Sequence, residues 1–274
     1  MFETLTYDES TLAPRLRDLS IPQDPATRRD WLRTAITLID LTTLNGYDTP
    51  DRVHTLVEKA QEPLPGDRSL TVAAICVYPA RVPDALGTPI PVATVSAGFP
   101  SGQIPVEPQL EVARQNIAQG ATEIDMVINR THALLDRWQD VQDEVAAFRG
   151  VCGDSAHLKV ILETGELGTA QRVYRAAWAS MAGGADFIKT STGKASENAT
   201  LEKGLVMLDA IRDYQAHSGR AVGFKPAGGI RSADDALRWM ALVRDTLGPE
   251  WITPARFRIG ASSLLDVLVA ELTH

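Results

Sequence analysis

The feature that most constrains the fold of this chain is a repeated alternation of short apolar runs with longer segments of helical period. The runs are rich in β-branched residues and lie at 38–42, 72–78, 91–98, 123–129, 158–164, 187–193, 221–229 and 256–263. Short β-branched runs that alternate with helices indicate βαβ units and a parallel sheet. Eight units of roughly 30 residues match the strand number and size of a (β/α)8 TIM barrel.

The segments between the runs carry helix start signals. Thr49 followed by Pro50 is typical of an N-cap and a first helical position. Ser232, with Asp235 three residues later, predicts a second capped helix. An open doubly wound sheet is the alternative architecture, but no GxGxxG motif follows the first run, which disfavours it.

The length of 274 residues, 44% of them hydrophobic, suits one large domain. We therefore predict a single barrel domain over residues 1–274, in which residues 1–30 form a short helical N-terminal extension outside the barrel. No internal linker, repeat or low-complexity segment interrupts the pattern.

The charge distribution limits the partners. The net charge is -8, and there is no run of five or more like charges, so nucleic acid or an acidic membrane surface is not an expected partner. A small phosphorylated substrate remains possible, because local cations can outweigh a diffuse negative background. Two cysteines give no disulfide framework, and neither a signal peptide nor a membrane span is evident, so we expect a cytoplasmic protein.

Charged residues occupy one parity of several runs. Side chains alternate along a strand, so that one parity faces the helices and the other faces the barrel axis. If the apolar parity packs under the helices, the charged side chains that point inward are Asp40, Asp125, Lys159, Glu163, Lys189 and Lys225. Barrel interiors are normally filled by Val, Ile and Leu, so packing alone does not explain charges on five strands.

Lys189 and Lys225 fall on adjacent strands, about 5 Å apart in the hydrogen-bonding direction. Two ammonium groups so close repel each other, and loss of one proton relieves the repulsion. A neutral lysine that faces a cleft can attack a carbonyl and form a Schiff base. A structural ion-pair network is the other interpretation of these residues.

Small residues end the last three runs in the stretches "STGK", "PAGG" and "GASS". Glycines let backbone N–H groups approach an anion, and the apolar segment after "GASS" predicts a helix whose N-terminus adds partial positive charge. Three such stretches at the carboxyl ends of consecutive strands predict the phosphate site that is typical of these barrels. "TSTGKA" is not a P-loop, because Ile188 stands where the first glycine is required.

The chain resembles the deoxyribose-phosphate aldolase family, class I aldolases on a (β/α)8 barrel. The similarity extends from about residue 38 to about residue 265. The stretches that carry it are "DLTTLN", "AAICVYP", "TVSAGFPSG", "EIDMVIN", "LKVILETGEL", "DFIKTSTGK", "GFKPAGGIR" and "RIGASS".

The resemblance implies roles for individual residues. Lys189 corresponds to the Schiff-base lysine, Lys225 to a second lysine that lowers its pKa and joins proton transfer, and Asp125 to the carboxylate of the proton relay. The positions that line the family's substrate pocket are Asp40, Thr42, Cys76, Lys159 and Thr192. The positions of its phosphate-binding part are Gly193, Lys194, Gly228, Gly229, Arg231, Gly260, Ser262 and Ser263.

The implied reaction is reversible cleavage of 2-deoxy-D-ribose 5-phosphate to D-glyceraldehyde 3-phosphate and acetaldehyde, with no cofactor and no metal. The five histidines show no ligand spacing with one another or with cysteine, which also disfavours a zinc aldolase. A transaldolase-like Schiff-base aldolase and an inactive sugar-phosphate-binding barrel are the alternatives. A homo-oligomer, dimer or tetramer, is left open. Some family members end in a tail with a terminal tyrosine, whereas this sequence ends in "ELTH", so a tail-dependent proton transfer is in doubt.

Overall fold

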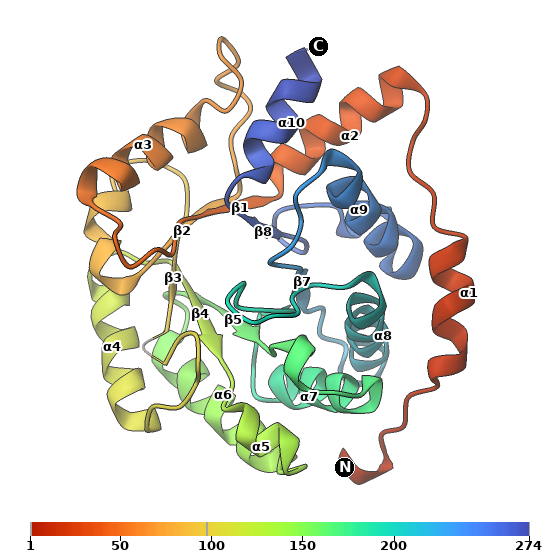
Figure 1. Cartoon of the computed structure of the whole chain (residues 1–274). Helices are drawn as coiled ribbons and strands as arrows, with labels where there is room; N and C mark the ends of the chain where they lie inside the picture. Colours follow the sequence, from red (N-terminus) through yellow and green to blue (C-terminus); the bar gives the residue numbers. More distant parts are fainter. Residues whose placement is uncertain (1, 97, 274) are drawn as a thin grey trace.

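A computed structural model describes residues 2–96 and 98–273, and in this part of the chain eight parallel strands form the centre of the molecule (Figure 1). The strands are β1 Ile39–Thr42, β2 Ala74–Val77, β3 Val92–Val95, β4 Glu123–Val127, β5 His157–Ile161, β6 Phe187–Lys189, β7 Gly223–Lys225 and β8 Ile259–Ala261. Each overlaps the run predicted for it; Ala97, within the third predicted run, lies outside the described residues.

The strands pair in the order β7-β6-β5-β4-β3-β2-β1-β8, and the two end strands then meet. The Phe224 N–H donates to the Arg256 carbonyl at 2.8 Å, and the Arg258 N–H donates to the Phe224 carbonyl at 3.0 Å. The Gly260 N–H donates to the Pro226 carbonyl at 2.9 Å. These bonds join β7 to the approach to β8 and to β8 itself, which confirms the prediction of a (β/α)8 barrel.

Helices surround the strands on all sides (Figure 1). They are α1 Leu12–Arg17, α2 Pro25–Thr37, α3 Pro50–Gln61, α4 Val106–Ala118, α5 Arg130–Leu134, α6 Trp138–Cys152, α7 Ala170–Ala182, α8 Leu201–Ser218, α9 Ala233–Leu247 and α10 Leu264–Thr273. Short 3-10 turns are η1 Phe2–Thr4, η2 Glu9–Thr11, η3 Pro79–Arg81, η4 Pro83–Ala85, η5 Thr164–Glu166 and η6 Pro249–Trp251.

Both predicted helix starts are confirmed. The Thr49 hydroxyl accepts the Arg52 N–H at the start of α3, with Pro50 as the first helical residue. Ser232 and Asp235 form a reciprocal capping box at the start of α9. Each cap satisfies backbone N–H groups that have no partner within the helix.

The first two helices lie outside the ring. α1 packs against α8, and α2 packs against α9 and α10 (Figure 1). α2 continues to Thr37, beyond the boundary predicted at residue 30, and leads almost directly into β1.

Side chains alternate along each strand between the layer of helices outside and the barrel axis inside. Ile124, Met126 and Ile128 of the β4 region are fully buried in the large apolar core between strands and helices.

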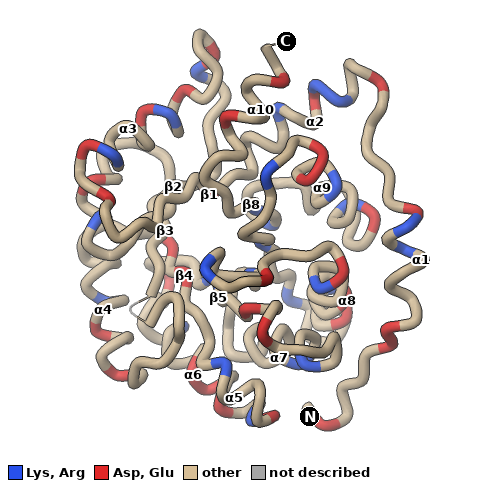
Figure 2. Tube along the Cα trace, viewed as in Figure 1, with Lys and Arg blue, Asp and Glu red and all other residues tan. Residues whose placement is uncertain are grey.

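Acidic and basic residues are interspersed along the outer helices (Figure 2). In the described ranges, no helix combines the length and apolarity needed to cross a membrane.

Candidate active site

Asp125 lies at the centre of a charged cluster inside the barrel. Its Oδ2 accepts hydrogen bonds from the Lys189 Nζ at 2.8 Å and from the Lys225 Nζ at 2.7 Å. Its Oδ1 accepts from the Lys159 Nζ at 3.2 Å. Register explains the convergence, because Asp125 pairs with Lys159 across β4 and β5, while Lys189 pairs with Lys225 across β6 and β7.

Asp40 from β1 supplies the second carboxylate. Its Oδ2 forms ion pairs with the Lys225 Nζ at 2.5 Å and the Lys159 Nζ at 3.4 Å. Asp40, Asp125, Lys159 and Lys225 are all fully buried. The structure thus brings together five of the six charged residues expected to point inward.

Glu123 and Arg258 also belong to this cluster, and the sequence analysis did not identify them. The Arg258 guanidinium donates to Asp40 Oδ1 at 2.7 Å and to Glu123 Oε1 at 2.9 Å. Glu123 Oε2 accepts from Lys159. Both residues lie two positions before an inward residue of their strand, Asp125 or Gly260, so the two-residue period could have found them.

The two neighbouring lysines have opposite pKa shifts. Burial, reinforced by the Lys225 charge, lowers the pKa of Lys189 despite the nearby Asp125. Burial also acts to lower the pKa of Lys225, but Asp125 and Asp40 outweigh it and raise that pKa. Lys189 is therefore the amine that can lose its proton, while Lys225 stays an ammonium.

Two carboxylates of the cluster, Asp125 and Asp40, have lowered pKa values. Burial opposes ionisation of Asp125, but Lys159, Lys189 and Lys225 overcome it and hold its pKa well below the usual range. Asp40 behaves alike, because Lys159, Lys225 and Arg258 outweigh its burial and lower its pKa. The site therefore presents ionised carboxylates beside an amine whose pKa is lowered.

Cys76 of β2 lies inside the barrel among apolar side chains of β3, β4 and β5. It is fully buried, and burial raises the pKa of its thiol. The thiol is therefore protonated, which fits a wall residue and not a nucleophile.

A cavity of about 410 Å³ opens above this cluster at the carboxyl ends of the strands. Lys189 lines it, whereas Lys225 does not. The other predicted residues that line it are Thr42, Thr192, Gly193, Lys194, Gly228, Gly229, Arg231, Gly260, Ser262 and Ser263. Asp40, Cys76, Asp125 and Lys159 are buried in the barrel and are not part of the lining.

The lining of this cavity is cationic. It includes Arg52 of α3, which the sequence analysis did not identify, together with Lys194 and Arg231. Within the described ranges no carboxylate contributes to the lining. Such a cavity favours an anionic ligand.

Glycine geometry shapes the rim. Gly193, Gly228 and Gly229 have φ values of 80°, 83° and 83°, a left-handed region that side-chain-bearing residues rarely adopt. α10 begins directly after Ser263, so its N-terminus faces the rim residues that precede it. The Lys194 Nζ donates to the Leu44 carbonyl at 2.7 Å, which links the loops after β6 and β1 across the mouth.

Glu163 lies at the end of the barrel and outside the lysine cluster, although its parity predicted an inward position. Its buried carboxylate accepts the Thr192 N–H at 3.2 Å and also the Thr192 hydroxyl. Its backbone is left-handed, with φ 55°, which is costly for a residue other than glycine. Glu163 therefore fixes the "STGK" loop instead of contributing to the lysine cluster.

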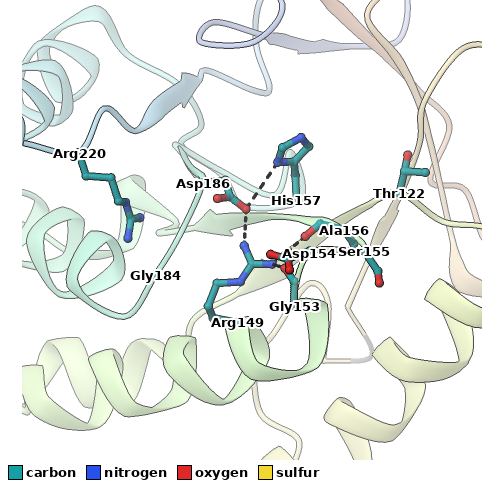
Figure 3. Close-up of a pocket in the computed structure, with 10 residues that line it drawn as sticks. All are labelled: Thr122, Arg149, Gly153, Asp154, Ser155, Ala156, His157, Gly184, Asp186 and Arg220. Atoms are coloured by element: carbon teal, nitrogen blue, oxygen red, sulfur yellow. Dashed lines mark hydrogen bonds and ion pairs between the residues drawn. The ribbon is translucent and has the colours of Figure 1, made fainter.

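A second cavity, of about 510 Å³, lies at the opposite end of the barrel (Figure 3). His157 begins β5 and Asp186 directly precedes β6, so this is the amino end of the strands. Arg149 bonds to Asp186 and to the Ala156 carbonyl, and Asp186 also accepts the Leu158 N–H. Arg149 and Asp186 thus bond to each other and to the local chain, and none of the predicted site residues lines this cavity.

In the part of the chain that the structure describes, no group of three or more His, Cys, Asp or Glu side chains is arranged to hold a metal ion. The described residues offer an amine with a lowered pKa, together with buried carboxylates and buried cations, beneath a cationic cavity.

Comparisons with known proteins agree with this geometry. The family model described as "DeoC/LacD family aldolase" matches residues 34–268. The deoxyribose-phosphate aldolase of Mus musculus is 51% identical over 259 residues, which cover 89% of this chain and 81% of the mouse protein.

Solved structures share the architecture. A Toxoplasma gondii protein superposes with a TM-score of 0.80 over 91% of this chain and 95% of its own, at 24% identity, which shows the fold alone. The deoxyribose phosphate aldolase of Aeropyrum pernix, described as tetrameric, gives a TM-score of 0.67 at 25% identity, over 89% of this chain and 97% of its own. The family match covers most of the chain, and the chain belongs to the DeoC/LacD aldolase family.

Proposed function

We propose that the protein is a class I deoxyribose-phosphate aldolase. It would cleave 2-deoxy-D-ribose 5-phosphate reversibly to D-glyceraldehyde 3-phosphate and acetaldehyde. The observation that carries the proposal is the position of Lys189, the one cluster lysine among the described residues that lines the cationic cavity. Its burial, which lowers its pKa, supports the same role. The name of the mouse relative supports the same activity.

The proposed reaction begins with the neutral Lys189 amine, which adds to the C1 aldehyde of the open-chain sugar. Loss of water gives a protonated imine. Asp125, paired with the Lys225 ammonium and acting through water, takes the proton of the C3 hydroxyl, and the C2–C3 bond breaks. Its electron pair moves toward the iminium nitrogen, which yields D-glyceraldehyde 3-phosphate and an acetaldehyde enamine. Protonation at C2 and hydrolysis then release acetaldehyde and free Lys189.

The substrate phosphate is assigned to the rim of the cavity. Lys194, Arg231 and the N-terminus of α10 supply positive charge there, and the glycine backbone allows close approach. Asp40, Thr42, Cys76, Lys159 and Thr192 complete the proposed substrate-binding set, either as lining or as the layer beneath it. No cofactor or metal takes part in the proposed steps.

Reductive trapping tests the nucleophile. Incubation with acetaldehyde and borohydride is expected to add one ethyl group to Lys189, because reduction fixes the imine. Peptide mass spectrometry gives the position, and Lys189→Arg is the matched control that keeps a cation but forms no adduct. An adduct on Lys225 or Lys159 would contradict the assignment.

A coupled assay of acetaldehyde release from 2-deoxy-D-ribose 5-phosphate tests the reaction. Release of acetaldehyde separates the proposed activity from a transaldolase-like enzyme, which would use a ketone donor, and from an inactive binding barrel. Activity is expected to survive EDTA, and its loss with recovery on adding metal would count against the metal-independent mechanism.

We also infer a cytoplasmic homo-oligomer, dimer or tetramer, with no nucleic-acid or membrane partner. The negative net charge and the tetrameric description of the Aeropyrum pernix protein support this inference. Sedimentation velocity gives the oligomeric state, and a monomer at all concentrations would contradict it.

A further inference from the structure

The charged cluster inside the barrel has one more base than it has acids. The described members that contact one another are Asp40, Glu123, Asp125, Lys159, Lys189, Lys225 and Arg258. Three carboxylates therefore face four bases. Full ionisation would leave one uncompensated positive charge in a buried site, which is unfavourable.

The contacts indicate which base is in excess. Lys159 forms ion pairs with three carboxylates, and Lys225 with two. Arg258 also bonds to two carboxylates and cannot lose its proton. Within the described part of the chain, Lys189 forms an ion pair with Asp125 alone, at 2.8 Å. Lys189 therefore loses least when it becomes neutral.

Arg258 is held in place by contacts besides the carboxylates. Its guanidinium lies over the Phe187 ring, 5.6 Å from the centroid, and its Nε donates to the Pro254 carbonyl. Its remaining donors go to Asp40 and Glu123. The planar fork thus keeps a permanent charge at a fixed place below the lysines.

We propose that Arg258 and Glu123 are positioning residues that set the charge balance of the barrel interior, and that Arg258 is the cation that leaves Lys189 as the surplus base. Without Arg258, three carboxylates would face three lysines, and Lys189 would keep its proton. Without the charge of Glu123, two carboxylates would face three other cations, and Lys189 would lose its proton more readily. This inference rests on the proposed Schiff-base role of Lys189.

Other groups around Lys189 do not change this balance. The ionisable groups that face it from each packed element, besides the cluster, are Cys76 of β2 and the cavity residues Arg52, Lys194 and Arg231. Burial raises the pKa of the Cys76 thiol, which keeps it neutral. The three cavity cations lie toward solvent, where salt screens them, and they are the same in every variant below.

The test compares the acid limb of the pH profile of kcat/KM in charge-changing variants. In the proposed mechanism this limb reports the pKa of Lys189, because the amine must lose its proton before it adds to the substrate. Glu123→Gln removes a negative charge and keeps a similar shape, so the limb is expected to move to lower pH by about one unit. Arg258→Met removes a positive charge, so the limb is expected to move to higher pH by about the same amount. The double variant restores the balance and should return the limb to near its original position.

Charge-preserving and remote changes are the controls. Arg258→Lys keeps the cation and should leave the limb within about 0.3 unit of the parent's. Glu111→Gln on the exposed face of α4 makes the same chemical change far from the cluster and should not move the limb. Circular dichroism and thermal unfolding show whether each variant folds. If Arg258→Met does not fold, the downward shift in Glu123→Gln still decides the matter.

Two results would overturn the inference. One is an unchanged acid limb in folded Glu123→Gln. The other is an acid limb that moves in the same direction in Glu123→Gln and in Arg258→Met, as a general loss of packing in the barrel would cause. Trapping at Lys189 in the same proteins separates this inference from the proposed function. An adduct at Lys189 with an unmoved limb rejects the charge-balance role alone, whereas an adduct elsewhere rejects both.

Discussion

A single carboxylate oxygen gives two lysines different roles. Asp125 Oδ2 accepts from both Lys189 and Lys225 at nearly equal distances, 2.8 and 2.7 Å. What separates them is Asp40, which forms an ion pair with Lys225 at 2.5 Å and, within the described ranges, no ion pair with Lys189. Because the second carboxylate favours the charged form of Lys225, the proton deficit falls on Lys189.

Replacing Lys225 tests this division of roles. Lys225→Leu removes the repelling charge and leaves Asp125 to stabilise protonated Lys189, so the pKa of Lys189 is expected to rise. The acid limb of kcat/KM should move to higher pH, and activity at neutral pH should fall on the order of a hundredfold or more. An unmoved limb in the folded variant would mean that burial alone tunes the nucleophile.

At the scale of the elements, the sequence was sufficient for local features. Thr49 and Ser232 marked helix starts, and the alternation around Asp125 and Lys189 placed both side chains on the inward parity. These features depend on neighbours within a few residues, which is why they can be read from the chain.

The contacts between elements were harder to predict. Parity extended by two residues would have placed Glu123 and Arg258 inside, but it could not have shown that one guanidinium joins Asp40 to Glu123. That bond depends on the register in which Asp40 pairs with Gly260 and Glu123 pairs with His157. Glu163 departed from the expectation because its left-handed backbone ends the alternation.

α6 provides a prediction about stability. Glu144 is buried on this helix and accepts the Asn129 N–H at 3.0 Å. Burial raises the pKa of Glu144 to about 7, and the bond from Asn129 offsets this only in part. Its raised pKa favours the folded state at acidic pH, and this contribution is lost as the pH rises through about 7.

Glu144→Gln keeps an acceptor and removes the ionisation. At pH 5 the free energy of unfolding of the variant is expected to be similar to that of the parent. At pH 8 it is expected to be about 2–3 kcal/mol higher than that of the parent. Urea unfolding at the two pH values measures the difference, with exposed Glu111→Gln as the control. If the free energies of unfolding of variant and parent differed by the same amount at both pH values, ionisation of Glu144 would not destabilise the folded state.

At the scale of the whole molecule, closure of the barrel assembles the proposed phosphate site. Gly193, Gly229 and Ser262 belong to three different strand ends and line one cavity. Sequence motifs located each loop, but only the ring brings them to one rim. Arg52 was missed because nothing in its own segment indicates that α3 begins beside that rim.

A charge placed at this rim tests the phosphate assignment. Ser262→Asp puts a carboxylate where the dianion is proposed to bind, so KM for 2-deoxy-D-ribose 5-phosphate is expected to rise about tenfold or more. KM for unphosphorylated deoxyribose should change little, because that sugar does not use the rim. Ser155→Asp, exposed at the opposite end of the barrel, adds the same charge as a control. Equal losses for both sugars would place the phosphate elsewhere.

A few backbone hydrogen bonds close the barrel between β7 and the residues that lead into β8. The pKa of Lys189 depends on this closure. Phe224 and Arg258 form one of these bonds, and their neighbour Lys225 and the Arg258 side chain also belong to the charged cluster. If these hydrogen bonds between β7 and the approach to β8 broke, water would reach the charged cluster and weaken every charge interaction in it. Lys189 would then lose the burial that lowers its pKa. Closure of the barrel therefore maintains the lowered pKa of Lys189 that the proposed reaction requires.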